Sequence, residues 1–133
     1  MKNCLILLSV LLVAGLSFNA CDKYESTISG TITYTNPDDE TPYPADYALV
    51  RKMTMKGDSL QSMVAVRTDN EGKYLFEHNT KGTWILSVEF EKDSITYFGL
   101  SDEFTTNGLD KIEKNIQLKI DRDRYCGSEY PIN

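Results

Sequence analysis

The chain has 133 residues, enough for one domain, and its 26% charged and 41% hydrophobic residues exclude wholesale disorder. A formal net charge of −6 argues against nucleic-acid binding, because phosphate contacts need clustered Lys and Arg. A single histidine excludes most His-based metal sites and His-relay catalysts.

Residues 1–20 are predicted to be a signal peptide that is cleaved before Cys21. The segment Leu5–Phe18 is an uncharged apolar run of the length of a signal-peptide core, and a lysine precedes it. Small Ala20 stands directly before Cys21, which resembles the lipobox of bacterial lipoproteins, where the cysteine is lipidated. The match departs from that motif at two positions, Phe18 and Asn19. A plain secretory signal and an uncleaved anchor are the alternatives.

Lipidation of Cys21 would hold the protein on a membrane outside the cytoplasm, at the outer membrane or the cell surface. Residues 21–26 would then be the lipidated cysteine with a short tether, and residues 122–133 a polar C-terminal tail. The tail carries Cys126, which has no second cysteine of the mature domain to form an internal disulfide.

Residues 27–121 are predicted to form one all-β domain, because apolar and polar residues alternate there with a period of two. The alternation is strongest in three segments, 28–34, 83–90 and 116–120. Four weaker strand candidates lie at 46–55, 60–68, 73–78 and 94–99. About seven short strands with turns between them predict a sandwich or a small barrel. Only 102–115 leaves room for a short turn of helix.

The segment Thr68–Phe76 is the most specific piece of this pattern. Asp69 can accept a hydrogen bond from the backbone two residues on, and Gly72 can adopt the positive φ that closes a tight hairpin. Tyr74 and Phe76 then point to one face of the strand that follows. These residues predict a structural hairpin rather than a ligand site.

Three segments together resemble the carboxypeptidase regulatory-like domain, a transthyretin-like module of exported bacterial proteins. Ile28–Ile32 matches its opening strand, Thr68–Phe76 its hairpin and Gly82–Val88 the strand after it. The likeness covers roughly residues 26–120 and departs from the family at the irregular stretch 51–55. It implies a seven-strand Ig-like β-sandwich that recognises or assembles other molecules and does no chemistry itself.

Catalysis and metal binding find little support in the residues. His78 stands at the end of a predicted strand with no nucleophile motif around it, so we expect a surface histidine and no catalytic residue. The acidic clusters lie in predicted loops and are expected to be hydrated, and the one at Asp69–Gly72 is too short for an EF-hand loop. We therefore expect a protein that is not an enzyme and that uses no cofactor or metal.

Aromatic residues offer the remaining candidate ligand site. Four of them fall on inward strand faces and are expected in the core: Tyr74, Phe76, Trp84 and Phe90. Tyr43 and Tyr47 lie in the long first loop, where an exposed platform could stack on a sugar. The sequence thus favours a lipid-anchored module that binds an envelope protein, with direct binding of an extracellular glycan through Tyr43 and Tyr47 as the alternative.

Overall fold

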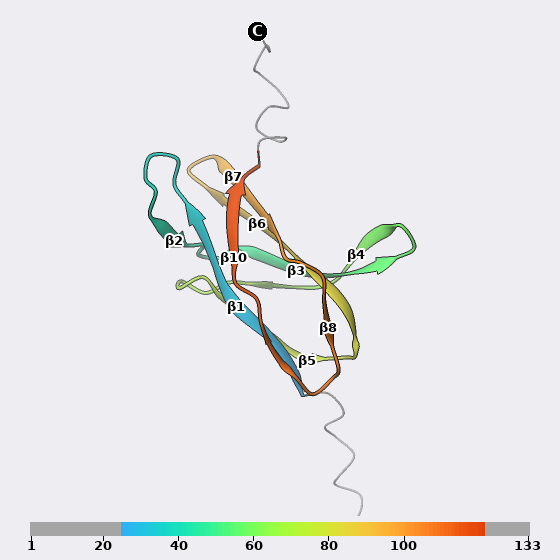
Figure 1. Ribbon diagram of the computed structural model, residues 1–133. Helices are drawn as coiled ribbons and strands as arrows, with labels where there is room; N and C mark the ends of the chain where they lie inside the picture. The colour runs from blue at the N-terminus through green and yellow to red at the C-terminus, as the bar shows by residue number, and fades with distance from the viewer. Residues whose placement is uncertain (1–24, 122–133) are drawn as a thin grey trace, which may run out of the picture.

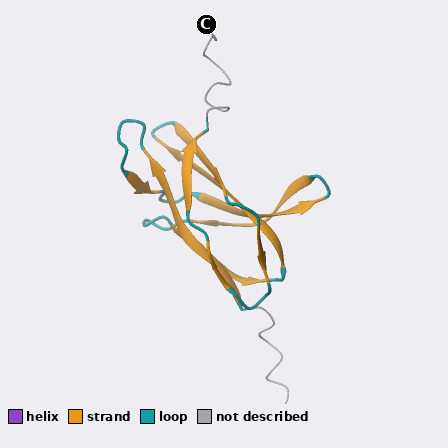
Figure 2. Ribbon diagram, viewed as in Figure 1, coloured by secondary structure: helices purple, strands orange, loops and turns teal. Residues whose placement is uncertain are grey.

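The computed structural model describes residues 25–121, and this part of the chain is all-β (Figures 1 and 2). The predicted signal peptide, Cys21 and the tail with Cys126 lie outside these residues. No helix of residues 25–121 is long and apolar enough to cross a membrane. The prediction of an all-β domain is confirmed.

Seven longer strands correspond to the seven predicted ones. They are β1 (Ser26–Thr35), β3 (Leu49–Lys56), β4 (Ser59–Arg67), β5 (Lys73–Asn79), β6 (Gly82–Lys92), β7 (Ile95–Leu100) and β10 (Ile116–Ile120). Three short strands were not predicted: β2 (Pro42–Pro44), β8 (Phe104–Thr106) and β9 (Lys111–Glu113).

The expectation of a helical turn in 102–115 is wrong. Phe104 and Thr106 are buried on one face of β8, which pairs with the start of β6. The chain then turns at Asn107, whose side-chain oxygen accepts hydrogen bonds from the backbone N–H groups of Leu109 and Asp110. Such an Asx turn competes with helix formation, and β9 begins directly after it.

The strands form a curled sheet in the order β2-β1-β10-β7-β6-β3-β4. β1 organises it, because its two halves have different neighbours. The second half pairs with β2 and, in parallel, with β10, whereas the first half pairs with β5 and, in parallel, with β9. At the other end of the order, the hairpin of β3 and β4 projects from the body of the domain (Figure 1).

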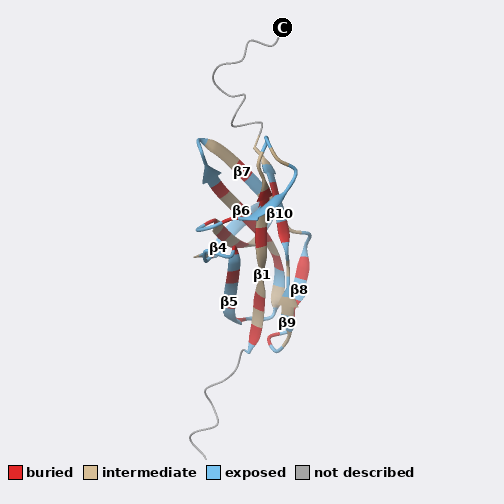
Figure 3. Cartoon of the chain, turned by 90° about the vertical axis from the view of Figure 1, so that its left-hand side faces the viewer, coloured by how far each residue is buried: buried red, intermediate tan, exposed pale blue. Residues whose placement is uncertain are grey.

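The core follows from the period-two pattern. Buried and exposed residues alternate along most strands, as the colouring of Figure 3 shows. The faces predicted to point inward do so, and they gather in one cluster that includes Ile28, Ile32, Phe76, Trp84, Leu86, Val88 and Leu118. At one end of this cluster three rings pack together, with the Tyr34 centroid 4.9 Å from Phe90 and 5.0 Å from Tyr97.

The predicted turn at Asp69 has the expected local geometry. The Asp69 carboxylate accepts hydrogen bonds from the backbone N–H groups of Glu71 and Lys73, both at 2.9 Å, and Gly72 has φ of 75°. The turn does not close a hairpin, however, because β4 pairs with β3 and β5 pairs with β1. It carries the chain from the sheet edge across to β1, where the N–H of Ile32 donates to the Gly72 carbonyl at 2.8 Å.

The irregular stretch 51–55 contains a buried lysine. Lys52 is only 8% exposed because it lies on the inward face of β3. Its Nζ donates to Asn79 Oδ1 at 2.7 Å and lies 4.4 Å from the centre of the Trp84 ring. Burial lowers the pKa of Lys52, and the ring and the amide take the place of a carboxylate partner.

Candidate functional site

The outer face of the sheet carries a row of side chains that crosses five strands. Backbone register defines it: residue 49 of β3 pairs with 67 of β4 and with 89 of β6, 89 pairs with 98 of β7, and 98 pairs with 119 of β10. Directly paired residues point to the same face of a sheet. We call these five residues the transverse row: Arg67, Leu49, Glu89, Phe98 and Lys119.

Tyr47 borders the β4 end of the transverse row. The residue is 68% exposed, and the Arg67 guanidinium lies 4.8 Å from the centre of its ring. Arg67 Nη1 also donates to the Tyr47 carbonyl at 3.1 Å. The backbone of Tyr47 has φ of 61°, which is uncommon for residues other than glycine. Such a conformation persists only when the surrounding structure holds it.

A hollow of about 330 Å³ opens beside this ring. It is lined mainly by polar groups, which are Asp46, Tyr47, Arg67, Glu89 and Glu91, together with Leu49 and Phe90. Glu89 is also held from the side by Arg51, whose Nη1 lies 3.3 Å from Glu89 Oε2. An exposed ring and several hydrogen-bonding groups thus meet in one open surface, and two of these groups, on Glu89 and Arg67, are held by neighbouring residues.

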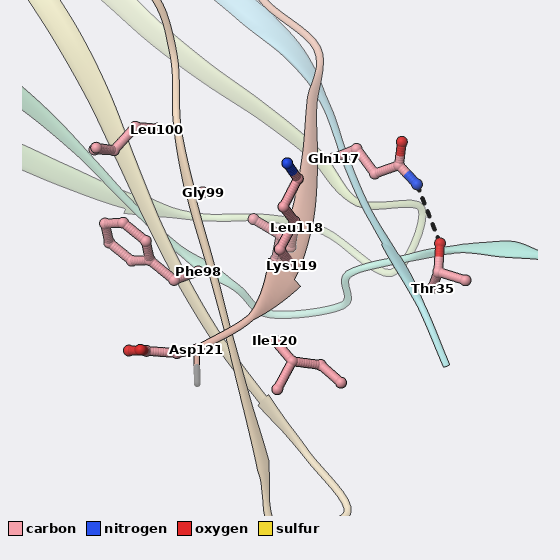
Figure 4. A pocket seen from close by; sticks show the side chains of 9 residues that line it. All are labelled: Thr35, Phe98, Gly99, Leu100, Gln117, Leu118, Lys119, Ile120 and Asp121. Carbon is pink, nitrogen blue, oxygen red and sulfur yellow. Dashed lines mark hydrogen bonds between the residues drawn. The ribbon is translucent and has the colours of Figure 1, made fainter. Parts of the chain in front are cut away.

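A second, larger hollow of about 840 Å³ follows at the β10 end of the row. It lies where β7, β10 and the end of β1 meet, and Figure 4 shows the residues around it. Phe98 and Leu100 extend from β7 on one side, and Gln117 reaches from β10 toward Thr35 on the other (Figure 4). Gln117 Nε2 donates to Thr35 Oγ1 at 3.1 Å, which fixes the amide at the rim.

The loop that presents Tyr47 is anchored by a buried threonine. Thr68 Oγ1 accepts a hydrogen bond from the backbone N–H of Ala48 at 2.7 Å and donates to the carbonyl of Ala45 at 2.5 Å. Thr68 is 3% exposed, and Ala45 and Ala48 are equally buried. One hydroxyl therefore pins both flanks of the exposed residues Asp46 and Tyr47.

The structure separates the two tyrosines that were expected to form one platform. Tyr43 is not in a loop but on β2, opposite Tyr34, which points into the core. The Tyr43 ring lies 6.0 Å from the Tyr34 ring. Its hydroxyl donates to Asp39, which lowers the pKa of that carboxyl and raises the pKa of Tyr43. Tyr43 is thus a partly exposed edge residue on the inward side, whereas Tyr47 lies beside the outer face.

The other residues discussed from the sequence have structural positions. Tyr74 and Phe76 are buried, and Trp84 donates from Nε1 to Thr106 Oγ1 at 2.9 Å. His78 is exposed near the end of β5. Within residues 25–121, no group of three or more His, Cys, Asp or Glu residues could hold a metal ion.

Sequence reasoning missed the transverse row and Phe98 in particular. Three strands supply Glu89, Phe98 and Lys119, and in its own strand each of them looks like an ordinary outward-facing residue. They become neighbours only through the pairing register of β6, β7 and β10. The available signal was that β7 is apolar on both faces, since Phe98 and Leu100 alternate with the inward Tyr97, so that large apolar side chains remain on its outer face.

Comparison with known proteins adds a fold relation. No family model matches the chain, and no curated protein matches it. Among solved structures, the chain is similar to "a putative carbohydrate binding protein" from Pseudomonas aeruginosa, with a TM-score of 0.50 and 14% sequence identity. The match covers 72% of this chain and 90% of that chain. At 14% identity the likeness is one of fold alone, a β-sandwich.

Proposed function

We propose that this domain is a non-catalytic binding module whose ligand is a glycan, held on the outer face of the sheet at Tyr47. The observation that carries the proposal is the exposed Tyr47 ring beside the carboxylates of Asp46, Glu89 and Glu91. A sugar ring offers an apolar face of C–H groups that packs on an aromatic ring, and hydroxyls around its edge. Carboxylates and a guanidinium can hydrogen-bond such hydroxyls and so orient the sugar.

The charges of the site favour a neutral glycan. Arg51 is paired with Glu89, and Arg67 is engaged by the ring and the carbonyl of Tyr47. Three carboxylates, of Asp46, Glu89 and Glu91, line the hollow against one guanidinium, that of Arg67, in a chain of net charge −6. A uronic acid or a sulfated sugar would meet repulsion there, whereas a neutral sugar would not. The shared fold with the Pseudomonas protein is compatible with this proposal.

A panel of neutral hexasaccharides (gluco-, manno- and xylo-oligosaccharides) tests the proposal, with affinity measured by calorimetry on the wild type and two variants. Tyr47→Ala is expected to weaken binding of the sugar that binds in this panel by about tenfold or more, since covering a large apolar side chain contributes roughly 1.5–3 kcal/mol. Tyr43→Ala removes an equal side chain from the inward side and should leave affinity unchanged. Equal affinity in both variants, or no binding by any sugar, would contradict the proposal.

We also propose the setting expected from the sequence, a lipoprotein anchored through Cys21 at the outer membrane or the cell surface. The resemblance to the carboxypeptidase regulatory-like domain supports it, because such modules accompany exported proteins. The prediction is that the mature protein carries acyl chains on Cys21 and that Cys21→Ser releases it from the membrane fraction. Mass spectrometry of the N-terminal peptide tests this, and a peptide without acyl chains on Cys21 would contradict the proposal.

A protein partner in the envelope remains a second candidate, and strand β4 supports it. Eight of the nine β4 residues are exposed, Leu60, Met63 and Val64 among them. Its outer edge has no pairing strand among residues 25–121, and such an edge can accept a strand from another protein. Val64→Lys should then abolish co-purification of an envelope partner while leaving glycan binding intact; unchanged co-purification would contradict this candidate.

A further inference from the structure

The two hollows of the outer face belong to one surface. The first is lined by Glu89 and the second by Phe98, and these two residues are direct cross-strand partners on β6 and β7. No strand therefore separates the hollows. The transverse row runs without a break from Arg67 on β4 to Lys119 on β10.

This continuity sets the size of the ligand. Five strands contribute to the row, so its ends are about 19 Å apart at the usual strand spacing. One pyranose ring fills only the hollow at Tyr47. A surface of this length matches a chain of several sugar units lying across the strands.

The far end of the row also carries an exposed aromatic ring. Phe98 is 36% exposed and offers a second ring, as Tyr47 does at the first hollow. Lys119 is the cross-strand neighbour of Phe98 on β10, and the amide of Gln117 lines the opposite side of the same hollow. Each hollow therefore combines one exposed ring with hydrogen-bonding groups, and the hollow at Phe98 is the more apolar of the two.

We propose that the module binds a linear neutral oligosaccharide across strands β4 to β10, with Tyr47 and Phe98 as separate subsites for different sugar units of one chain. This inference rests on the proposed glycan-binding function and adds the length and the direction of the ligand. A single sugar or a disaccharide would occupy the Tyr47 subsite alone.

The test compares the di-, tri-, tetra- and hexasaccharide of the neutral sugar that binds in the panel, by calorimetry. Affinity is expected to rise roughly a hundredfold from the disaccharide to the hexasaccharide. A tenfold rise corresponds to about 1.4 kcal/mol of binding free energy. Phe98→Ala should lower affinity for the hexasaccharide about tenfold and leave the disaccharide unchanged, whereas Tyr47→Ala should weaken both.

Leu109→Ala serves as the control, because Leu109 is an apolar residue away from the row that is as exposed as Tyr47, at 68%. Urea unfolding of each variant shows that it is folded. Affinity that is independent of chain length, with Phe98→Ala unaffected, would overturn the two-subsite inference while the binding function stands. Absence of binding for every length would overturn both.

Discussion

At the scale of single residues, Lys52 is the clearest departure from a simple hydrophobic core. Its ammonium group is enclosed by the Trp84 and Phe76 rings and has Asn79 Oδ1 as its hydrogen-bond acceptor. Asn79 is fixed in turn, because its Nδ2 donates to the carbonyls of Ser26 and Phe76. The polar group is therefore satisfied, but its charge has lost water, and this desolvation lowers the pKa.

This lowered pKa has a consequence for stability. Between the folded pKa and the ordinary value of 10.5, the unfolded chain binds more protons than the folded chain at Lys52. Stability contributed by this group therefore rises as pH rises through that window. We expect the free energy of unfolding of the wild type, relative to that of Lys52→Met, to increase from pH 7 to pH 10.5. Urea unfolding of both proteins at these two pH values measures it. A constant difference between the two proteins would contradict this account.

Gly72 is the second position where one residue decides local structure. Its φ is 75°, and a Cβ would lie 2.5 Å from the Ile32 carbonyl oxygen. Gly72→Ala should therefore destabilise by more than about 2 kcal/mol, from conformational strain and the backbone clash together. Gly57→Ala is the matched control, since Gly57 also has a positive φ, 65°, but a Cβ added there would have no neighbouring atom within 4 Å. Its expected loss is only about 1–2 kcal/mol in thermal or urea unfolding, and equal losses would refute the steric argument.

At the scale of elements, the sequence was informative about strands and much less so about their partners. Alternation predicted seven strands and the inward faces of β1, β6 and β10, because burial of one face is a local property of the pattern. It placed the turn at Asp69 correctly but assigned it to a hairpin. The pairing of β5 with β1 involves residues about 45 positions apart, which no local pattern encodes.

The same limit explains the candidate site. Tyr47 was singled out because it was assigned to the long first loop, where an exposed platform could stack on a sugar. Tyr43 was grouped with it because nothing local reveals that β2 pairs with β1 and turns this ring toward Tyr34. The transverse row exists only through the register of five strands, and it could not be predicted without their order.

Thr68 tests the link between a buried element and the exposed site. Thr68→Val removes the oxygen that binds Ala45 and Ala48, which leaves two buried backbone groups unpaired at a cost of about 2–3 kcal/mol. The loop around Tyr47 should loosen as well, so glycan affinity should fall in parallel with stability. Thr68→Ser keeps the hydroxyl and should lose about 1 kcal/mol of stability at most, with affinity retained. Wild-type affinity in a folded Thr68→Val variant would disprove this role.

At the scale of the whole molecule, the described chain enters and leaves at opposite ends. Residue 25 lies at one end of the domain, and β10 runs to the other, where Asp121 follows (Figure 1). Lys119 and Phe98 belong to the end remote from residue 25. With a lipid on Cys21, as proposed, this arrangement would hold the β10 side of the transverse row away from the membrane and open to ligands.

The most direct test of glycan binding on the outer face is a titration of the ¹⁵N-labelled domain with the hexasaccharide that binds in the panel, followed by backbone amide shifts. The account predicts shifts concentrated in residues 46–49, 89–91, 98–100 and 117–119, with little change along β4 up to Val66 or at Tyr43. Shifts confined to β2 or to the β4 edge would contradict the assignment of the site, and an unchanged spectrum at saturating sugar would contradict glycan binding itself.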